Sequence, residues 1–169
     1  MTKIRCAPSL LLLAALAVFA SGCERDEPVA GVVDAPVEFG AGTVVIETDD
    51  VSFTLGVEVA ESEAQRSRGL MQRTSLDPDS GMIFLFDSEQ PPENTFWMYN
   101  TLIPLDIAFI GSDGRIGSIR EMEPCTSPYP QWCQYYEAGV PFESALEVNA
   151  GYFEEHGIGV GDPVSLTTE

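Results

Sequence analysis

Short apolar runs recur along most of this chain and are separated by Gly, Pro and Asp. In residues 52–59 apolar side chains occupy every second position from Phe53 to Val59, which is the pattern of a strand with one buried face. Residues 111–114, Gly-Ser-Asp-Gly, lie between two such runs and have the composition of a hairpin turn. The pattern predicts strands at residues 43–48, 52–59, 82–86, 95–99, 105–110, 115–121, 144–148 and 163–167. Many short strands with regular turns are typical of a mainly β protein, here a β-sandwich or barrel-like domain.

Two segments depart from the β pattern and predict short helices. The first covers residues 61–71, with Ser62 or Glu61 at its start and Gly69 near its end. The second covers residues 150–156 and is stopped by the glycine that follows. We therefore expect one β domain carrying two short helices.

The charge of the chain excludes several classes of function. Its 169 residues suffice for one domain, and they hold 27 Asp and Glu against 8 Lys and Arg, for a net charge of -19. Such a polyanion repels nucleic-acid phosphates, so we expect no nucleic-acid partner. The single histidine, His156, excludes a zinc site built from several His ligands, and we expect neither a metal nor a cofactor.

The N-terminal residues 1–22 have the composition of an export signal. Lys3 and Arg5 precede an apolar run at residues 10–20, which is about 16 Å long as a helix and too short for a hydrocarbon core of about 30 Å. The run ends in Ala-Ser-Gly before Cys23, and this ending resembles the lipobox of bacterial lipoproteins, in which the cysteine is lipidated. The alternative is an ordinary signal peptide that leaves Cys23 as a free thiol.

Residues 23–42 separate that signal from the first predicted strand. They mix charged residues, Gly, Pro and small side chains without a sustained period, as a flexible tether does. The compact domain is therefore predicted at residues 43–169. Removing the signal deletes two positive charges and no acid, so the exported part carries -19 - 2 = -21.

Three motifs in this part resemble the DUF192 family, also known as COG1430. They are residues 68–73 (RGLMQR), 81–84 (GMIF) and 96–110 (FWMYNTLIPLDIAFI). The resemblance runs from about Val51 to Leu166 and includes a matching end at residues 145–148. It implies a compact, mostly β fold, and it supplies no mechanism because the family is best known as a domain of unknown function.

The same motifs contain the candidate site. Arg68 and Asp106 are opposite charges in apolar contexts, and charges inside apolar strands are costly unless they are paired, so one interpretation is a structural ion pair. The other interpretation is a ligand pocket, because aromatic side chains with a few convergent polar groups commonly hold sugars or peptide fragments. The candidate ligand-binding residues are Arg68, Trp97, Met98, Asn100, Thr101 and Asp106.

Cys125 and Cys133 are the two cysteines of the predicted domain. Export permits disulfides, so one bridge between them is the simple assignment, and the resemblance to DUF192 supports it because the family often has paired cysteines here. A redox or metal role is disfavoured, since the spacing is not C-x-x-C and no histidine lies nearby.

These features predict an exported lipoprotein, held at a bacterial membrane only through its N-terminal lipid and facing the periplasm or exterior. We expect a non-catalytic domain that binds a small molecule or an envelope protein, with the Tyr- and Trp-rich residues 129–136 as the candidate protein contact. One alternative is an enzyme acting on an envelope saccharide or peptide with Asp106 as acid or base. Another is a structural role in envelope assembly.

Overall fold

The computed structural model describes residues 36–169 of the 169-residue chain. Nine strands, two α-helices and one 3-10 turn make up this part. They are β1 (Gly40–Glu47), β2 (Ser52–Ala60), α1 (Glu63–Arg68), β3 (Ser80–Gln90), β4 (Thr95–Trp97), β5 (Leu105–Ile110), β6 (Ile116–Met122), η1 (Pro130–Trp132), β7 (Tyr135–Glu137), β8 (Phe142–Asn149), α2 (Tyr152–Glu155) and β9 (Val164–Thr168).

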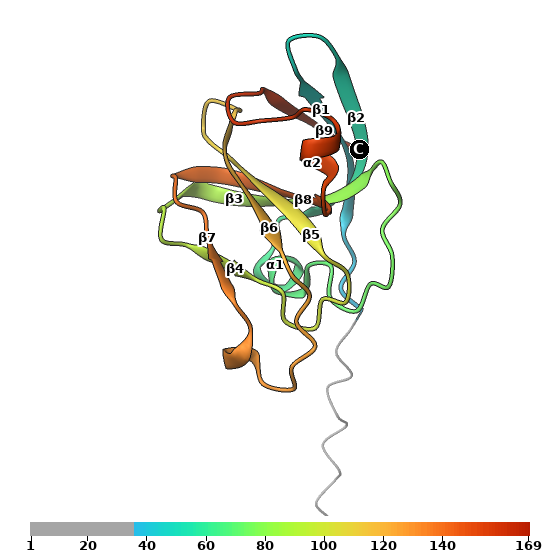
Figure 1. Ribbon diagram of the computed structural model, residues 1–169, viewed down its shortest axis with the longest axis vertical. Coiled ribbons are helices and arrows are strands. Elements are labelled where there is room, and N and C mark those ends of the chain that lie inside the picture. The colour runs from blue at the N-terminus through green and yellow to red at the C-terminus, as the bar shows by residue number, and fades with distance from the viewer. Residues whose placement is uncertain (1–35) are drawn as a thin grey trace, which may run out of the picture. The chain divides into compact units, whose positions relative to one another are not determined.

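The main sheet has seven strands in the order β6-β5-β8-β3-β2-β1-β9. Neighbouring strands are antiparallel except β2 and β3, which are parallel because α1 lies in the connection between them. The two outer strands of this order meet at one end, where Arg115 and Pro163 form an isolated bridge and Val164 N–H donates to the Gly114 carbonyl at 2.8 Å. The sheet is therefore curled into a barrel-like shape (Figure 1).

Apolar side chains pack on both faces of the sheet. One cluster draws alternate residues from β1, β2, β3, β5, β6 and β8 and is covered at one end by Tyr152 and Phe153 of α2. A second cluster lies on the other face of β3, β5 and β8 and includes Leu70, Met98 and Tyr136. A strand that is covered on both faces is buried at every position, and this is the case for all residues of β5.

The segments that cover the second face are α1 and a two-stranded sheet of β4 and β7. Figure 1 shows these three elements in the lower half of the domain and β1, β2, β9 and α2 in the upper half. Helix α1 is short but well capped: the Ser62 hydroxyl accepts from Gln65 N–H, and the Gln65 side chain accepts from Ser62 N–H. It ends at Gly69, whose φ of 45° and ψ of -144° only glycine adopts readily.

The predicted fold class is confirmed. All eight predicted strands and both predicted helices are present, with their ends shifted by a few residues. Helix α1 is shorter than residues 61–71, because Gly69 leaves the helical conformation and ends it. Strand β7 was not predicted: it has only three residues and overlaps the end of the Tyr- and Trp-rich residues 129–136, where no strand was expected.

The predicted signal at residues 1–22 and lipidated Cys23 lie outside the described residues, as does most of the predicted tether. In the last residues of the predicted tether, Phe39 packs against the second apolar cluster, and β1 already begins at Gly40. No helix in residues 36–169 is long and apolar enough to cross a membrane.

Candidate functional site

Glu147 lies in the middle of β8, between Met82 of β3 and Ile107 of β5. Only 5% of its surface is exposed, and its neighbours on the adjacent strands are apolar. Strands β3 and β8 approach closely here: a Cβ added at Gly81 would lie 2.5 Å from the Glu147 carbonyl oxygen, so β3 needs glycine at that position. The sheet thus fixes a carboxyl group in an apolar layer.

Burial raises the pKa of Glu147 to about 8. A buried carboxylate is costly without a cation or hydrogen-bond donors, so this carboxyl group is protonated at neutral pH. Its side chain makes no hydrogen bond within residues 36–169, and neither does that of Thr101, which is also 5% exposed. Every fully enclosed side-chain N or O atom of the described residues has a partner, so the oxygens of Glu147 and Thr101 keep access to a cavity.

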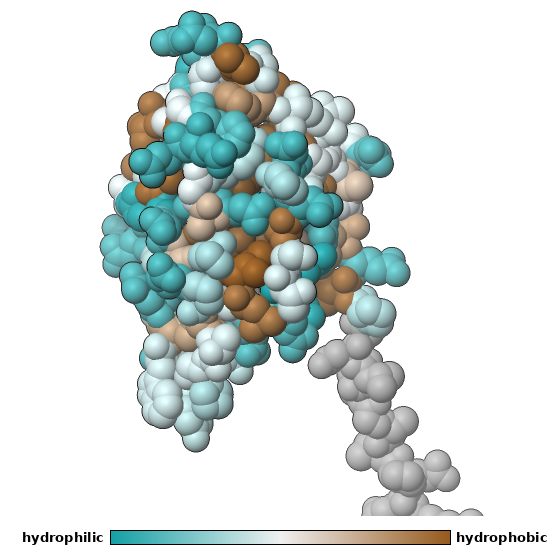
Figure 2. Space-filling view, turned by 45° about the vertical axis from the view of Figure 1, so that its right-hand side comes forward, coloured by the Kyte–Doolittle hydropathy of each residue, from teal (hydrophilic) through white to brown (hydrophobic). Residues whose placement is uncertain are grey.

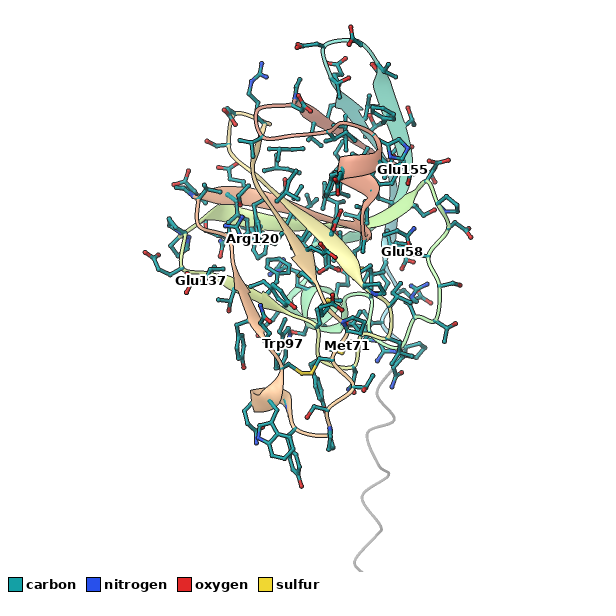
Figure 3. The ribbon with its side chains drawn as sticks, viewed as in Figure 1. Glu58, Met71, Trp97, Arg120, Glu137 and Glu155 are labelled. Atoms are coloured by element: carbon teal, nitrogen blue, oxygen red, sulfur yellow. A yellow bond between two sulfur atoms is a disulfide. The ribbon has the colours of Figure 1, made fainter. Side chains whose placement is uncertain are left out.

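That cavity has a volume of about 30 Å³, and we refer to it as the Glu147 cavity. Its walls come from the end of α1 and the turn that follows, from the aromatic side chains of β3 and β4, and from two buried polar residues. The lining residues are Arg66, Ser67, Arg68, Gly69, Leu70, Met71, Phe84, Phe96, Trp97, Thr101 and Glu147. Figure 3 shows Met71 and Trp97 at the same lower end of the domain.

A larger cleft of about 270 Å³ adjoins the Glu147 cavity between α1 and β4. The two spaces share five lining residues: Arg66, Ser67, Phe84, Phe96 and Trp97. The base of this α1–β4 cleft is aromatic, since Phe86 and Phe142 join Phe84 and Phe96 there. On the face seen in Figure 2, hydrophobic residues gather in the middle and hydrophilic residues surround them. An apolar cleft with a few polar groups at its end is the usual form of a small-molecule site.

The arginines beside the cavity are held by groups other than Glu147. Arg66 donates to the carbonyls of Glu61 and Leu85 and lies over the Phe86 ring, 5.0 Å from its centroid. Arg68 donates to the Gln72 side chain at 3.1 Å. The ion pair that the described residues do contain, between Arg73 and Glu58, lies elsewhere.

Two strained residues brace the turns beside the cavity. Gln72 has a φ of 63° and Asn100 a φ of 56°, and they are the two non-glycine residues with positive φ in residues 36–169. Gln72 N–H donates to the Asn100 carbonyl at 2.8 Å, which ties the turn after α1 to the segment that carries Thr101. Backbone strain of this kind often accompanies functional sites.

An exposed aromatic surface continues from the cleft. The ring of Trp97 stacks on Tyr135 with centroids 6.0 Å apart, and Tyr129 packs edge-on against Trp132 at 4.4 Å. Trp132 is 67% exposed and Tyr135 is 52% exposed. The projection at the lower left of Figure 2 has intermediate hydropathy, as expected for Tyr, Trp, Pro and Ser.

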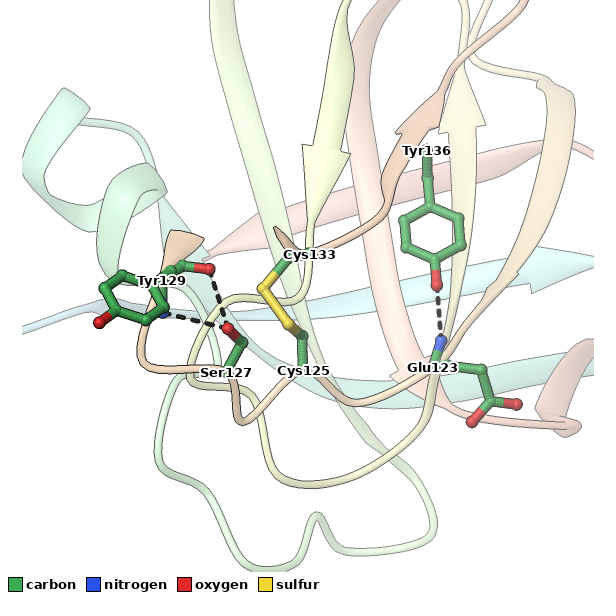
Figure 4. The surroundings of a disulfide bond; sticks show 6 residues. All are labelled: Glu123, Cys125, Ser127, Tyr129, Cys133 and Tyr136. Carbon is green, nitrogen blue, oxygen red and sulfur yellow. Dashed lines mark hydrogen bonds between the residues drawn. A yellow bond between two sulfur atoms is a disulfide. The ribbon is translucent and has the colours of Figure 1, made fainter. Parts of the chain in front are cut away.

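The predicted disulfide is confirmed and holds this surface in place. Cys125 and Cys133 are bonded, with Cα atoms 5.7 Å apart (Figure 4). Cys125 also exchanges backbone hydrogen bonds with the site segment, since Asn100 N–H donates to its carbonyl at 2.9 Å and its own N–H donates to Thr101. Tyr136 is fixed as well, because its hydroxyl accepts from Glu123 N–H at 2.9 Å.

Comparison with known proteins identifies the family. The model of DUF192, described as "Uncharacterized ACR, COG1430", matches residues 44–166. The chain belongs to the DUF192 family. A search of curated proteins finds no match.

Two solved structures resemble this DUF192 domain. A candidate transcription regulator from Sinorhizobium meliloti 1021 is 34% identical with a TM-score of 0.69; the match covers 78% of this chain and 97% of that one. A protein of unknown function from Novosphingobium aromaticivorans DSM 12444 is also 34% identical with a TM-score of 0.62, covering 82% of this chain and 89% of that one. Both support the fold, and neither states an activity that explains the site.

Some of the predicted ligand-binding residues line the Glu147 cavity in the DUF192 domain, and the others do not. Arg68, Trp97 and Thr101 line the Glu147 cavity, which agrees with the interpretation that they share a ligand pocket. Met98 is 1% exposed and belongs to the second core cluster, so it supports the site from below. Asn100 does not line the cavity and contributes its backbone to the turn beside it.

Asp106 does not lie with the others, and the expected Arg68–Asp106 ion pair is wrong. Asp106 pairs with Val148 on β8, whereas its neighbour Ile107 pairs with Glu147. Successive residues of a strand point to opposite faces, so Asp106 faces away from the Glu147 cavity. There its carboxylate accepts from Gly151 N–H at 3.0 Å. This arrangement gives Asp106 a structural partner and no place in the cleft as acid or base.

The pKa of Asp106 is raised, chiefly because burial penalises the charged form. Backbone hydrogen bonds from Phe153 and Gly151 oppose this shift, and the negative charges of Glu121 and Glu154 add to it. The carboxyl group therefore acts as a cap for the turn that begins α2, although the helix has no capping side chain of its own.

Glu147 is the site residue that sequence reasoning missed. The signal was present, because Glu147 stands between Leu146 and Val148 just as Asp106 stands between Leu105 and Ile107. The rule that singled out a charge inside an apolar strand applies equally to both positions.

Proposed function

We propose that this protein is an exported lipoprotein whose DUF192 domain binds a small ligand in the α1–β4 cleft, with the polar end of the ligand in the Glu147 cavity. One observation carries the proposal. Glu147 and Thr101 are both buried, both lack a side-chain partner within residues 36–169, and both line the same cavity. Their side-chain oxygens are not fully enclosed but open to this cavity, so they are available to hydrogen-bond a ligand that enters it.

The surroundings support binding of an organic molecule. The cleft beside the cavity has an aromatic base that can bury a hydrocarbon or ring body. The disulfide and the Gln72–Asn100 hydrogen bond hold its walls in position without the ligand, which lowers the entropy lost on binding. A preformed site of this kind suits a binding protein.

The export part of the proposal rests on the lipobox-like residues before Cys23 and on the Cys125–Cys133 bridge, because disulfides persist in oxidising compartments. Several acyl chains at Cys23 would anchor the protein stably at the membrane surface. Incorporation of radiolabelled palmitate tests this point: we expect labelling of the native chain and none of Cys23→Ser. Labelling that persists in the variant contradicts the anchor.

A thermal-shift screen of the full chain against amines, sugars and cell-wall fragments tests ligand binding. We expect at least one compound to raise Tm for the native protein, because a ligand that binds the folded state stabilises it by mass action. Glu147→Leu should abolish the shift while leaving the fold intact, since it replaces a buried carboxyl group by an apolar side chain of similar size.

The matched control is Glu143→Leu, on the same strand but exposed. It should retain the ligand-induced shift. A compound that stabilises the native protein and both variants equally binds somewhere other than the cleft, and a screen without any stabilising compound contradicts the proposal.

A further inference from the structure

We propose that the Glu147 cavity binds the primary ammonium group of an amine whose hydrocarbon body lies in the α1–β4 cleft. This inference rests on the proposed function and names the class of its ligand. It follows from three properties of the cavity: its aromatic walls, its small volume and the missing partner of its carboxyl group.

The walls of the cavity suit a cation. Phe84, Phe96 and Trp97 all line it, and the negative face of an aromatic ring attracts an ammonium group. Glu147 supplies a carboxylate at the base, and the Thr101 hydroxyl can accept a further hydrogen bond. An ammonium group has three donors and no acceptor, so a carboxylate and a hydroxyl oxygen are the partners that it needs.

The volume selects a primary ammonium group. A single buried water needs about 10–15 Å³ of such space, and the cavity offers about 30 Å³. The nitrogen of a primary ammonium group and its one attached carbon therefore fit in the cavity. A trimethylammonium group, with its nitrogen and three methyl carbons, does not. The rest of the ligand lies in the adjoining cleft of about 270 Å³, over Phe86 and Phe142.

Within residues 36–169, no positive charge pairs with Glu147. The facing residues on β3 and β5 are Met82 and Ile107, which do not titrate, and β4 contributes Trp97. The charged groups on α1 are Arg66, Arg68 and Glu63, which lines the outer cleft. Arg66 and Arg68 also line the cavity and are positively charged, but hydrogen bonds hold both guanidinium groups to neutral acceptors. Burial is the cause of the raised pKa of Glu147 and neither arginine contributes to it, so neither lies close enough to pair with the carboxyl group.

The charge of the whole chain favours the same ligand class. With 27 acidic against 8 basic residues, its field attracts cations and repels anions. In the empty site the carboxyl group is protonated. Binding of an ammonium ion replaces that proton: Glu147 loses H⁺ to the solvent, and the resulting carboxylate pairs with the bound cation.

The test uses 2-phenylethylammonium as the probe and the full chain in detergent, with a micelle blank. Isothermal titration at pH 7 in two buffers of different ionisation enthalpy should show release of close to one proton per ligand bound. The affinity should rise about tenfold from pH 6 to pH 7 and level off above pH 8, because Glu147 must ionise to bind the cation.

Variants and matched probes separate the possible ligand classes. Glu147→Gln keeps the hydrogen-bonding shape of the side chain but cannot become negative, so it should weaken binding at least tenfold and abolish proton release. Glu143→Gln, the same change at an exposed position of β8, should bind as the native protein does. The neutral isostere 2-phenylethanol and the anion 3-phenylpropionate should bind at least tenfold more weakly than the amine.

Other outcomes overturn the inference in distinguishable ways. If the alcohol or the anion binds as tightly as the amine, and Glu147→Leu removes that binding, the cleft is a ligand site but the ammonium assignment is wrong. The assignment also fails if amine affinity falls as pH rises from 6 to 8. If none of the three probes binds and the broader screen also finds no ligand, the inference and the proposed function fall together.

Discussion

Two carboxyl groups are buried in the same sheet, one register step apart and on opposite faces. Asp106 and Glu147 are each 5% exposed, and each stands between apolar neighbours along its strand. Asp106 accepts a hydrogen bond from Gly151 N–H, whereas the Glu147 side chain has no partner within residues 36–169 and lines a cavity. Burial alone does not distinguish them, but their hydrogen bonding does.

The difference separates a structural role from a binding role. A partnered carboxylate contributes to stability, because removing it leaves backbone donors buried and unpaired. An unpartnered one reduces stability, and a protein retains such a group when the group serves another purpose. The same contrast occurs between two buried hydroxyl groups: Ser118 donates to the Ala138 carbonyl at 2.6 Å, and Thr101 has no side-chain partner among the described residues.

The largest expected effect is on the pH dependence of stability. The folded-state pKa of Glu147, about 8, lies above the unfolded value of 4.5, so the folded protein binds more protons between these two values. Stability attributable to the protonated group is fully present below about pH 4.5 and is lost as pH rises to about 8. Relative to Glu147→Gln, the native chain should lose roughly 1 kcal/mol of unfolding free energy per pH unit between about pH 5 and pH 8.

Denaturant unfolding of both proteins at each pH measures this difference. The raised pKa of Asp106 acts in the same direction but is common to the two chains, as is the repulsion among the surface acids, so both cancel in the comparison. Parallel pH profiles for the native protein and Glu147→Gln would show that Glu147 ionises normally, and the contrast with Asp106 would disappear.

Asp106→Ala should have the next largest effect: it should lower the free energy of unfolding, whereas Glu147→Leu should not. Its loss removes the acceptor of Gly151 N–H in a partly buried turn, which costs about 1 kcal/mol. Glu147→Leu should be neutral or stabilising, because it removes a buried polar group that has no side-chain hydrogen bond in the described part of the chain. Urea unfolding at pH 7 compares the two. Equal destabilisation by both variants would mean that Glu147 is a structural residue as Asp106 is.

The fold could be predicted from the sequence because its signals are local. Alternation in residues 52–59, the Ser62 and Gly69 helix ends, and the glycines of residues 111–114 each depend on neighbours along the chain. Strand β7 has three residues, and its pairing with β4 is set by a partner about forty residues earlier, so no local pattern indicated it.

The candidate site could be predicted only in part, for a physical reason. Arg68, Trp97 and Thr101 were singled out because their motifs combine polar and aromatic groups, and all three line the Glu147 cavity. The sequence offers the same apolar context for Asp106 and Glu147, and their roles diverge through contacts made in space. Asp106 is satisfied by the backbone of Gly151, which lies 45 residues away in the chain, and no pattern of side chains encodes a backbone donor.

The hydroxyl groups of Ser118 and Thr101 provide the comparison with the smallest expected change in stability. Ser118→Ala should cost about 1 kcal/mol, the lower part of the usual range, because Arg120 still donates to the Ala138 carbonyl at 3.0 Å. Thr101→Val keeps the shape of the side chain and the backbone bonds of residue 101, and it removes a hydroxyl group that has no hydrogen-bond partner in residues 36–169. It should therefore change stability by less than about 0.5 kcal/mol while weakening ligand binding. If thermal unfolding shows Thr101→Val to be as destabilising as Ser118→Ala, the Thr101 hydroxyl has a structural partner. Glu147 would then lack Thr101 as an unpartnered neighbour in the cavity.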